Sequence, residues 1–422
     1  MSKKIQHMRN ALRERPELYL FMLLIVLVAL GNGFSDAVYG NYYKEVYNVT
    51  AQQRAFIEFP RELPGVLCSV IIAALAMLGD YRLSIIAQIL ALFGLTVMGL
   101  STPPYALMLV FLFINSLGMH LFFPLQDSIG MSLAEPDKLG RRVGQYASIR
   151  TACAFVSGII IFITFRTGVF TFKSNIRPVF LVGSAFFLLA MLVAILLLKV
   201  VDKDSVRQPR QRIKLLFKKE YKYYYVLTAL SGVQKQLAYV YGSWVVIELL
   251  LKGTDVMSML TIVASFVGIL FYRQLGKWLD RFGVKRLMTF SALMFITIYM
   301  LYGFVVWAVV EHLIPGDRWK VMLVYLMFIL DRMSMQTAIV NSIYLKSIAL
   351  VPADVTPALS AGVSLDHVMS IIAAQVCGLI WVYAGPQYVF FFAAVFSLGN
   401  LYVARKVRIE QPSVASAQTE QN

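Results

Sequence analysis

The sequence predicts an all-α membrane protein with twelve transmembrane helices in two pseudo-symmetric bundles of six. Of its 422 residues, 59% are hydrophobic and 15% are charged, and the mean hydropathy is +0.69. Soluble domains are typically about 45–50% apolar and about 25% charged. The apolar residues fall in repeated runs of about 18–25 residues, the length that crosses about 30 Å of hydrocarbon. A linker at 201–221, rich in Lys, Arg and Gln, separates two groups of six runs.

The apolar runs give the expected boundaries of the spans. The predicted transmembrane spans are 18–40, 53–78, 83–101, 105–130, 143–165, 178–200, 222–250, 255–276, 287–310, 320–346, 356–383 and 386–404. The expected domains are an N-terminal bundle at 1–200, a cytoplasmic linker at 201–221 and a C-terminal bundle with a short tail at 222–422.

The distribution of basic residues predicts the orientation. Cytoplasmic loops of membrane proteins are enriched in Lys and Arg, and most of the 39 Lys and Arg residues lie in alternate loops, in the linker and at the N-terminus. Both termini are therefore expected in the cytoplasm, with the chain in the inner membrane. The net charge of +16 is thereby explained as a topology signal, so we expect no nucleic-acid partner.

The two halves carry short internal matches. Val38-Tyr39-Gly40 in the first span recurs as Val240-Tyr241-Gly242 in the seventh, and Pro136 after the fourth span recurs as Pro352 after the tenth. The matches occur at corresponding points and in the same helix order, as a duplicated six-helix unit predicts.

Charged side chains are absent from the apolar interiors of every third span, the third, sixth, ninth and twelfth. A charge costs several kcal/mol in hydrocarbon, so intramembrane charges face the protein interior or a wet cavity. The spans that carry charges or histidine hold Asp36, Glu58, Arg61, Glu62, His120, Asp127, Arg150, Lys235, Glu248, Asp331, Arg332, Asp366 and His367.

One loop motif resembles a known family. Residues 276–286, GKWLDRFGVKR, resemble the loop signature Gly-x-Leu-Ala-Asp-Arg-x-Gly-Arg-Lys-Arg of the major facilitator superfamily. The resemblance implies alternating access and a cavity lined by the first, fourth, seventh and tenth helices. It also implies that Asp280 and Arg281 help to close the cytoplasmic side. The N-terminal copy of the motif retains Asp80 and Arg82 but lacks the second Gly and the basic tail.

The polar residues of these four helices form the candidate substrate site. Such a lining suits a polar solute with several hydrogen-bonding groups, although any of these side chains could instead bond between helices. The candidates are Asn32, Asp36, Tyr39, Asn115, His120, Gln126, Gln234, Lys235, Tyr241, Trp244, Asp331, Arg332, Gln336 and Asn341.

A second set of residues is expected to serve coupling or gating. Glu58 and Glu62 lie on one helical face beside Arg61, and a buried carboxylate that changes partners can bind and release a proton. A static ion network and direct substrate contact remain open for these three residues. Arg150 and Asp366 occupy equivalent positions in the two halves, as a functional or a structural pair, and His367 and Asp127 are included with them.

The leading hypothesis is a secondary transporter that moves a small polar or charged organic solute, with protons or another ion as the coupling species. Efflux of lipophilic compounds is the alternative, and a transporter-shaped receptor or lipid-handling scaffold is a third. We find no phosphate loop, zinc spacing or catalytic constellation, so no enzyme, cofactor or metal is expected. Cys68, Cys153 and Cys377 lie in apolar runs and are expected to be reduced. We expect a monomer in the lipid bilayer.

Overall fold

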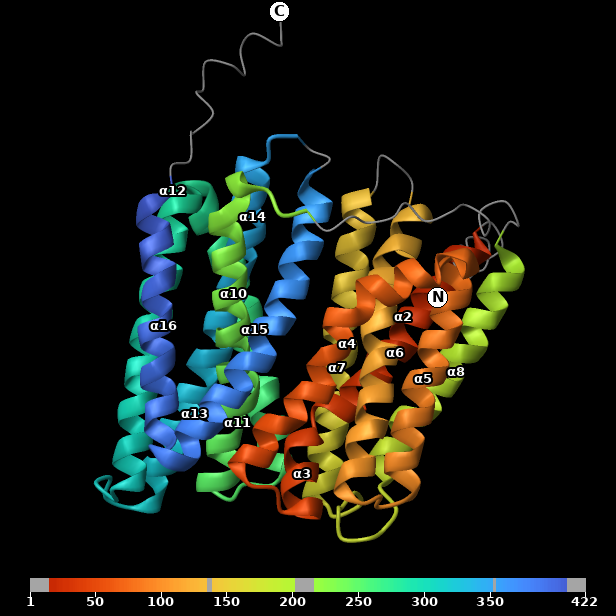
Figure 1. Ribbon diagram of the computed structural model, residues 1–422. Helices are drawn as coiled ribbons and strands as arrows, with labels where there is room; N and C mark the ends of the chain where they lie inside the picture. Colours follow the sequence, from red (N-terminus) through yellow and green to blue (C-terminus); the bar gives the residue numbers. More distant parts are fainter. Residues whose placement is uncertain (1–14, 135–138, 202–215, 352–353, 408–422) are drawn as a thin grey trace, which may run out of the picture.

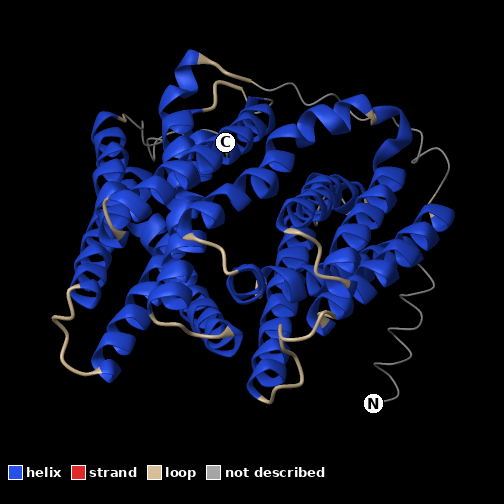
Figure 2. Cartoon of the chain, turned by 60° about the horizontal axis from the view of Figure 1, so that its bottom comes forward, coloured by secondary structure: helices blue, strands red, loops and turns tan. Residues whose placement is uncertain are grey.

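The computed structural model describes residues 15–134, 139–201, 216–351 and 354–407, and these are almost entirely helical (Figures 1 and 2). Nine helices in the described part of the chain are long and apolar enough to cross a membrane. The chain is thus a multi-pass α-helical membrane protein. All three cysteines are buried.

The described part of the first half packs seven helices side by side, of which α2 and α3 together form one span. Arg15 precedes α2, which begins with Pro16 and breaks at 37–38 before α3 continues the span. The helices are α2 (Pro16–Asp36), α3 (Tyr39–Tyr47), α4 (Ala51–Ala74), α5 (Gly79–Leu100), α6 (Tyr105–Ser132), α7 (Leu139–Arg166) and α8 (Pro178–Val200). The neighbours in this group are α5 with α6, α2 with α8, α5 with α8, α2 with α7 and α4 with α6.

The second half begins with an irregular span. There, π-helical turns η4 (Leu237–Tyr241) and η5 (Val245–Leu249) flank α11 (Gly242–Trp244), directly after α10 (Lys222–Gln236). The remaining elements are α12 (Thr254–Val310), α13 (Asp317–Ser334), η6 (Met335–Ala338), α14 (Ile339–Ile348), α15 (Val355–Tyr383) and α16 (Pro386–Lys406). The neighbours here are α12 with α13 and α16, and α10 with α15 and α16.

Four predicted spans differ from the elements that the structure shows. The predicted spans 255–276 and 287–310 are both part of α12, whose backbone breaks at Gly283 with φ 75°. A positive φ favours glycine, so the glycine of the loop motif makes the turn between the two arms of α12. The predicted spans 53–78 and 222–250 correspond to α4 and to α10–η5. Neither is among the nine described helices that are long and apolar enough to cross a membrane. The total of twelve spans stays a prediction, as do the expected domain boundaries, because residues 202–215 lie outside the described part.

Two ends of the bundle can be distinguished in Figure 1. The α3 end holds α3 and the loops at 101–104, 167–177, 250–253, 311–316 and 384–385. The Gly283 end holds the beginning of α2, the turn of α12 and the end of α16. The two halves meet along two helix pairs, α4 with α15 and α7 with α12. In Figure 1, α4 and α15 lie closest towards the α3 end and separate towards the Gly283 end.

Close packing of α5 on α6 depends on small residues. A Cβ atom at Gly118 would overlap the carbonyl oxygen of Ala87, and one at Gly94 would overlap the carbonyl oxygen of Phe111. Membrane helices use small residues at such contacts because van der Waals packing is a main driving force for their association.

We predict that Gly118→Ala destabilises the protein by about 1–3 kcal/mol, because the added methyl group must displace backbone. The measurement is the melting temperature of the purified protein in detergent. Gly144→Ala is the matched control, since a Cβ there meets nothing within 4 Å. Equal melting temperatures for Gly118→Ala and the unmodified protein would show that the α5–α6 contact is looser than described.

Candidate functional site

A chain of charged side chains runs along the buried face of α4. Thr50 caps this helix through a reciprocal capping box with Gln53, which fixes where α4 begins. Arg54 Nη1 donates to Glu58 Oε1 at 2.6 Å, one helical turn along. Arg61 Nε donates to Glu58 Oε2 at 2.9 Å, and Glu58 is 0% exposed. Both partners of Glu58 therefore come from its own helix.

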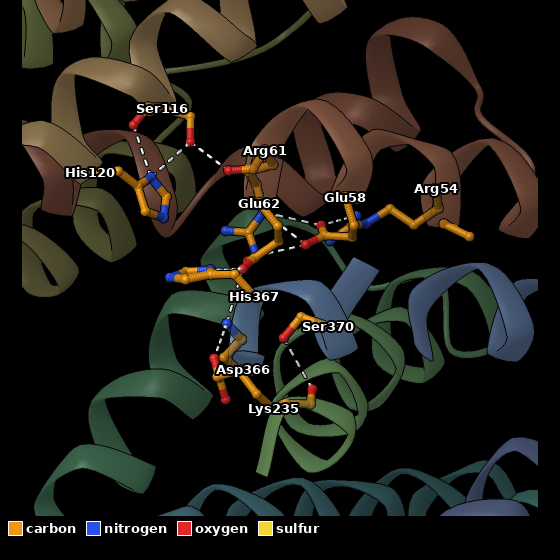
Figure 3. A network of polar contacts seen from close by, with 12 residues as sticks. Arg54, Glu58, Arg61, Glu62, Ser116, His120, Lys235, Asp366, His367 and Ser370 are labelled. Atoms are coloured by element: carbon orange, nitrogen blue, oxygen red, sulfur yellow. Dashed lines mark hydrogen bonds and ion pairs between the residues drawn. The ribbon is translucent and has the colours of Figure 1, made fainter. Parts of the chain in front are cut away.

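Glu62 differs from Glu58 because its partners come from both halves (Figure 3). Arg61 Nη2 donates to Glu62 Oε1 at 3.1 Å within α4. From the other half, Lys235 Nζ lies 2.9 Å and His367 Nδ1 lies 2.6 Å from Glu62 Oε2. Lys235 also donates to Asp366 Oδ2 at 2.7 Å. The carboxylate of Glu62 thus joins α4 to α10 and α15.

The surroundings of Glu62 hold this junction in place. His367 packs against Gly65, where a Cβ would lie 2.6 Å from the imidazole ring. His120 on α6 contacts the His367 ring with centroids 5.0 Å apart. Ser116 bonds both the carbonyl oxygen of Arg61 and the Nδ1 atom of His120. His120 from the first half and His367 from the second half therefore meet beside Glu62 (Figure 3).

Further contacts tie the halves together at the α3 end. Lys44 Nζ lies 2.5 Å from Glu248 Oε2, and Arg166 Nη1 lies 3.3 Å from Asp255 Oδ2. The side chain of Asn41 donates to the carbonyl oxygen of Lys252 at 3.0 Å. These pairs join α3 to the region of η5, and α7 to the first arm of α12, so the α3 end is closed.

The Gly283 end lacks such contacts between α4 and α15 in the described part of the chain. Within the described ranges, no hydrogen bond or ion pair joins α4 to α15 beyond Glu62 and His367 in that direction. The motif residues Asp280 and Arg281 are exposed and have no ion pair with any residue that the structure describes. The gating role expected of Asp280 and Arg281 stays a prediction. Asp80, the counterpart of Asp280 in the first half, lies at the start of α5.

The expected cavity set divides by exposure. Asp36 is exposed although it lies inside the bundle, and Asn32, His120, Lys235, Arg332, Gln336 and Asn341 are half-buried. Tyr39 donates to Asn115 at 2.9 Å, and Asn115 in turn donates to the carbonyl oxygen of Ala91. Tyr39 and Asn115 therefore fit the alternative interpretation, in which polar side chains form hydrogen bonds between helices.

Several other expected cavity residues are buried among the helices. Gln234 donates to Ser397 at 3.1 Å, and Tyr241 donates to the carbonyl oxygen of Ala374. Trp244 is 0% exposed, and Asp331 is 1% exposed beside Gly242. Gln126 is 2% exposed in α6. These five side chains pack among helices in this conformation.

The remaining candidates lie towards the Gly283 end. Arg150 Nη1 is 3.9 Å from Asp127 Oδ1, and these side chains are 41% and 69% exposed. The pseudo-equivalent residues Arg150 and Asp366 do not pair with each other, since Asp366 bonds Lys235. Exposed pairs of this kind contribute little to stability.

Sequence reasoning missed three contributors. Arg54 precedes Glu58 by one turn, and this i,i+4 spacing could have revealed it. Ser116 and Lys44 had no usable signal, and although Glu248 was noted as a charge inside a span, its pairing with Lys44 depends on how the halves meet. No group of three or more His, Cys, Asp or Glu side chains in the described segments could hold a metal ion.

The arrangement can change protonation by changing partners. If the halves separate at the α3 end, Glu62 loses Lys235 and His367 and keeps only Arg61. Loss of nearby cations favours the neutral form of a buried carboxyl. Glu58 keeps both partners in any rigid motion of the halves.

The chain was compared with known proteins. The model of the Major Facilitator Superfamily matches residues 20–365. No curated protein sequence matches the chain.

Solved structures of transporters share the fold. The nucleoside transporter NupG has a TM-score of 0.70 at 15% identity, covering 93% of this chain and 100% of that one. The xylose transporter XylE from E. coli, in a partially occluded inward-open conformation, has a TM-score of 0.67 at 15% identity, covering 94% and 99%. A POT family transporter in complex with a thioalcohol-conjugated peptide has a TM-score of 0.70 at 13% identity, covering 92% and 95%. At these identities the similarity shows the fold alone.

We predict that a short bifunctional thiol reagent joins Lys44→Cys to Glu248→Cys, because the native side chains meet at 2.5 Å across the halves. The pair Ala74→Cys with Ser360→Cys, on α4 and α15 towards the Gly283 end, is the matched control and should not react. The native cysteines are buried and can remain. A protease site is introduced in the 202–215 segment and cut after the reaction. Cross-linked halves then migrate together on a gel, and halves without the cross-link separate. Efficient joining of the control pair alone would contradict a closed α3 end.

Proposed function

This chain belongs to the Major Facilitator Superfamily, and from that premise we propose that it is a secondary active transporter of a small polar or charged organic solute, driven by protons. The proposal places it in the inner membrane with both termini cytoplasmic, so that the α3 end is external. The conformation described is then closed to the outside. We propose further that residues 1–200 and 222–422 move as the two bundles of an alternating-access cycle.

The bonding of Glu62 from both halves carries this proposal. Opening to the outside must pull Glu62 away from Lys235 and His367, while Lys235 keeps Asp366 within its own half. A charge left without its partners in a low dielectric is costly. A proton bound to Glu62 removes that charge, so the outward movement and proton binding favour each other.

The other acids in the network fit this assignment less well. Glu58 is held by Arg54 and Arg61 of the same helix, which supports the static reading for that residue. Asp127 is 69% exposed and 3.9 Å from Arg150, so solvent already screens its charge. Glu62 is the acid in this network with hydrogen-bond partners from both halves.

A polar solute is supported by the accessible charges inside the bundle. Asp36 is exposed, and the side chains of Arg61 and Lys235 are 28% and 23% exposed. Accessible groups of both signs favour a hydrogen-bonding or charged substrate over a lipophilic one.

The first test is thermal. The purified protein is melted at two pH values with sugars, organic acids, amino acids, nucleosides and lipophilic cations. A ligand at about 100 times its Kd stabilises by about 2.7 kcal/mol if it binds the folded state alone. We expect a polar solute to raise the melting temperature. Stabilisation by lipophilic compounds alone would favour efflux and overturn the proposal.

The second test is transport. In proteoliposomes, Glu62→Gln should abolish accumulation of the stabilising solute driven by a pH gradient, because the neutral amide cannot bind or release a proton. Exchange of labelled for unlabelled solute should persist. Asp127→Asn is the matched control and should keep gradient-driven uptake. Normal accumulation by Glu62→Gln would remove Glu62 from coupling.

A further inference from the structure

Most charges in the middle of the spans have an opposite charge within 4 Å, and two accessible ones do not. The paired residues are Arg54, Glu58, Arg61, Glu62, Asp127, Arg150, Lys235 and Asp366. Asp36 and Arg332 form no ion pair with any described residue, although Asp36 is exposed and Arg332 is half-buried. Asp331 also lacks one, but at 1% exposure no solute can reach it.

Arg332 is held by aromatic rings in place of a carboxylate. Its guanidinium carbon lies 4.0 Å from the centroid of Tyr239 and 5.1 Å from that of Phe328. Nη2 donates to Ser243 at 3.1 Å, while the buried Nε has no partner. A planar guanidinium stacked on rings keeps its fork of donors in a fixed orientation. Such a fork fits a carboxylate or phosphate, and Tyr239 is itself 49% exposed.

Asp36 offers the opposite charge in the other half. It is the last residue of α2, where the helix breaks before α3. The charges of Arg61, Glu62 and Glu58 act on it, and none of these residues is bonded to it. An exposed carboxylate without a salt-bridge partner is suited to bind an amine.

The internal repeats of the sequence relate the positions of the two groups. Asp36 is close to Arg61, whose carbonyl oxygen accepts a hydrogen bond from Ser116. The repeat that relates Pro136 to Pro352 also relates Ser116 to Arg332. The repeat that relates Tyr39 to Tyr241 places Asp36 opposite Ala238, next to Tyr239. The repeats therefore assign Asp36 and Arg332 to one layer, on opposite halves.

This layer lies just inside the closure at the α3 end. A Cβ at Gly40 would lie 2.8 Å from the side chain of Ile247, so the halves are in contact there. Gly40 is four residues beyond Asp36, a rise of about 6 Å in a helix. A solute that reaches Asp36 from the Gly283 end would thus rest on the closed side of the protein.

We propose that the transported solute is a small zwitterion, whose amine binds Asp36 and whose anionic group, carboxylate or phosphate, binds Arg332. The part between the two charges lies against the ring of Tyr239. Such a solute pairs both free charges at once and adds no net charge to the interior. This inference rests on the proposed transport function and names its substrate class.

The test uses the full-length protein in detergent and follows its melting temperature. The probes are the free amino acids, a panel of dipeptides and phosphoethanolamine, with glucose and uridine as neutral polar solutes. The best zwitterion is then compared with two blocked forms, the amine acetylated in one and the anionic group amidated or esterified in the other. We expect stabilisation by a zwitterion, and at least about tenfold weaker binding after either block.

The variants assign each charge to its partner. In Asp36→Asn, acetylation of the amine should no longer weaken binding, while blocking the anion still should. In Arg332→Gln the pattern should reverse. Arg332→Lys keeps the positive charge if the Gln variant fails to fold, and it should retain part of the discrimination between anionic and blocked forms. Lys320→Gln, at a surface pair with Asp317, is the control and should bind like the unmodified protein.

The outcomes separate the two proposals. Stabilisation by glucose or uridine with none by a zwitterion would overturn the inference and leave polar-solute transport standing. Zwitterion binding that ignores both Asp36→Asn and Arg332→Gln would overturn it as well. Stabilisation by lipophilic cations alone would overturn the proposed function itself.

Discussion

The carboxylate of Glu62 is bonded from both halves of the protein at once, and it joins α4 to α10 and α15. A carboxylate at 4% exposure is costly to bury unless cations and donors surround it. Arg61 is a partner of this carboxylate from the same helix, and Lys235 and His367 are its partners from across the interface. Because these last two are lost when the halves part, the same contact that stabilises this conformation sets the cost of leaving it.

The neighbouring contacts follow from this constraint. Glu58 holds Arg61 from within the same helix, so the bond from Arg61 to Glu62 does not involve the other half. Lys235 is shared between Glu62 and Asp366 and therefore keeps a counter-ion whichever way the halves move. Gly65 leaves room for the His367 ring. Closure at the α3 end by Lys44 and Glu248 then leaves access to the interior from the Gly283 end.

The sequence predicted the helical membrane fold because hydrocarbon admits few charges, and this requirement marks every span locally. It also predicted that charges gather on the helices that face the interior, among them α4 and α15. It could not predict which charges meet, since the pairing of Glu62 with Lys235 depends on the tilt of one bundle against the other. For the same reason Tyr241 and Gln234, expected in the cavity, lie packed within the second half, and Trp244 is buried with Lys44 of the first half over its ring. The π-helical turns around α11 shift the face that each residue presents, and no local pattern foretold them.

Infrared difference spectroscopy measures most directly whether Glu62 binds a proton when the halves part. The spectrum of protein locked shut at the α3 end is subtracted from that of the same protein after the lock is released. Our account predicts a new absorption band from a protonated carboxylic acid on release, which is missing in Glu62→Gln and present in Asp127→Asn. The same band in Glu62→Gln, or no band in either protein, would contradict the account.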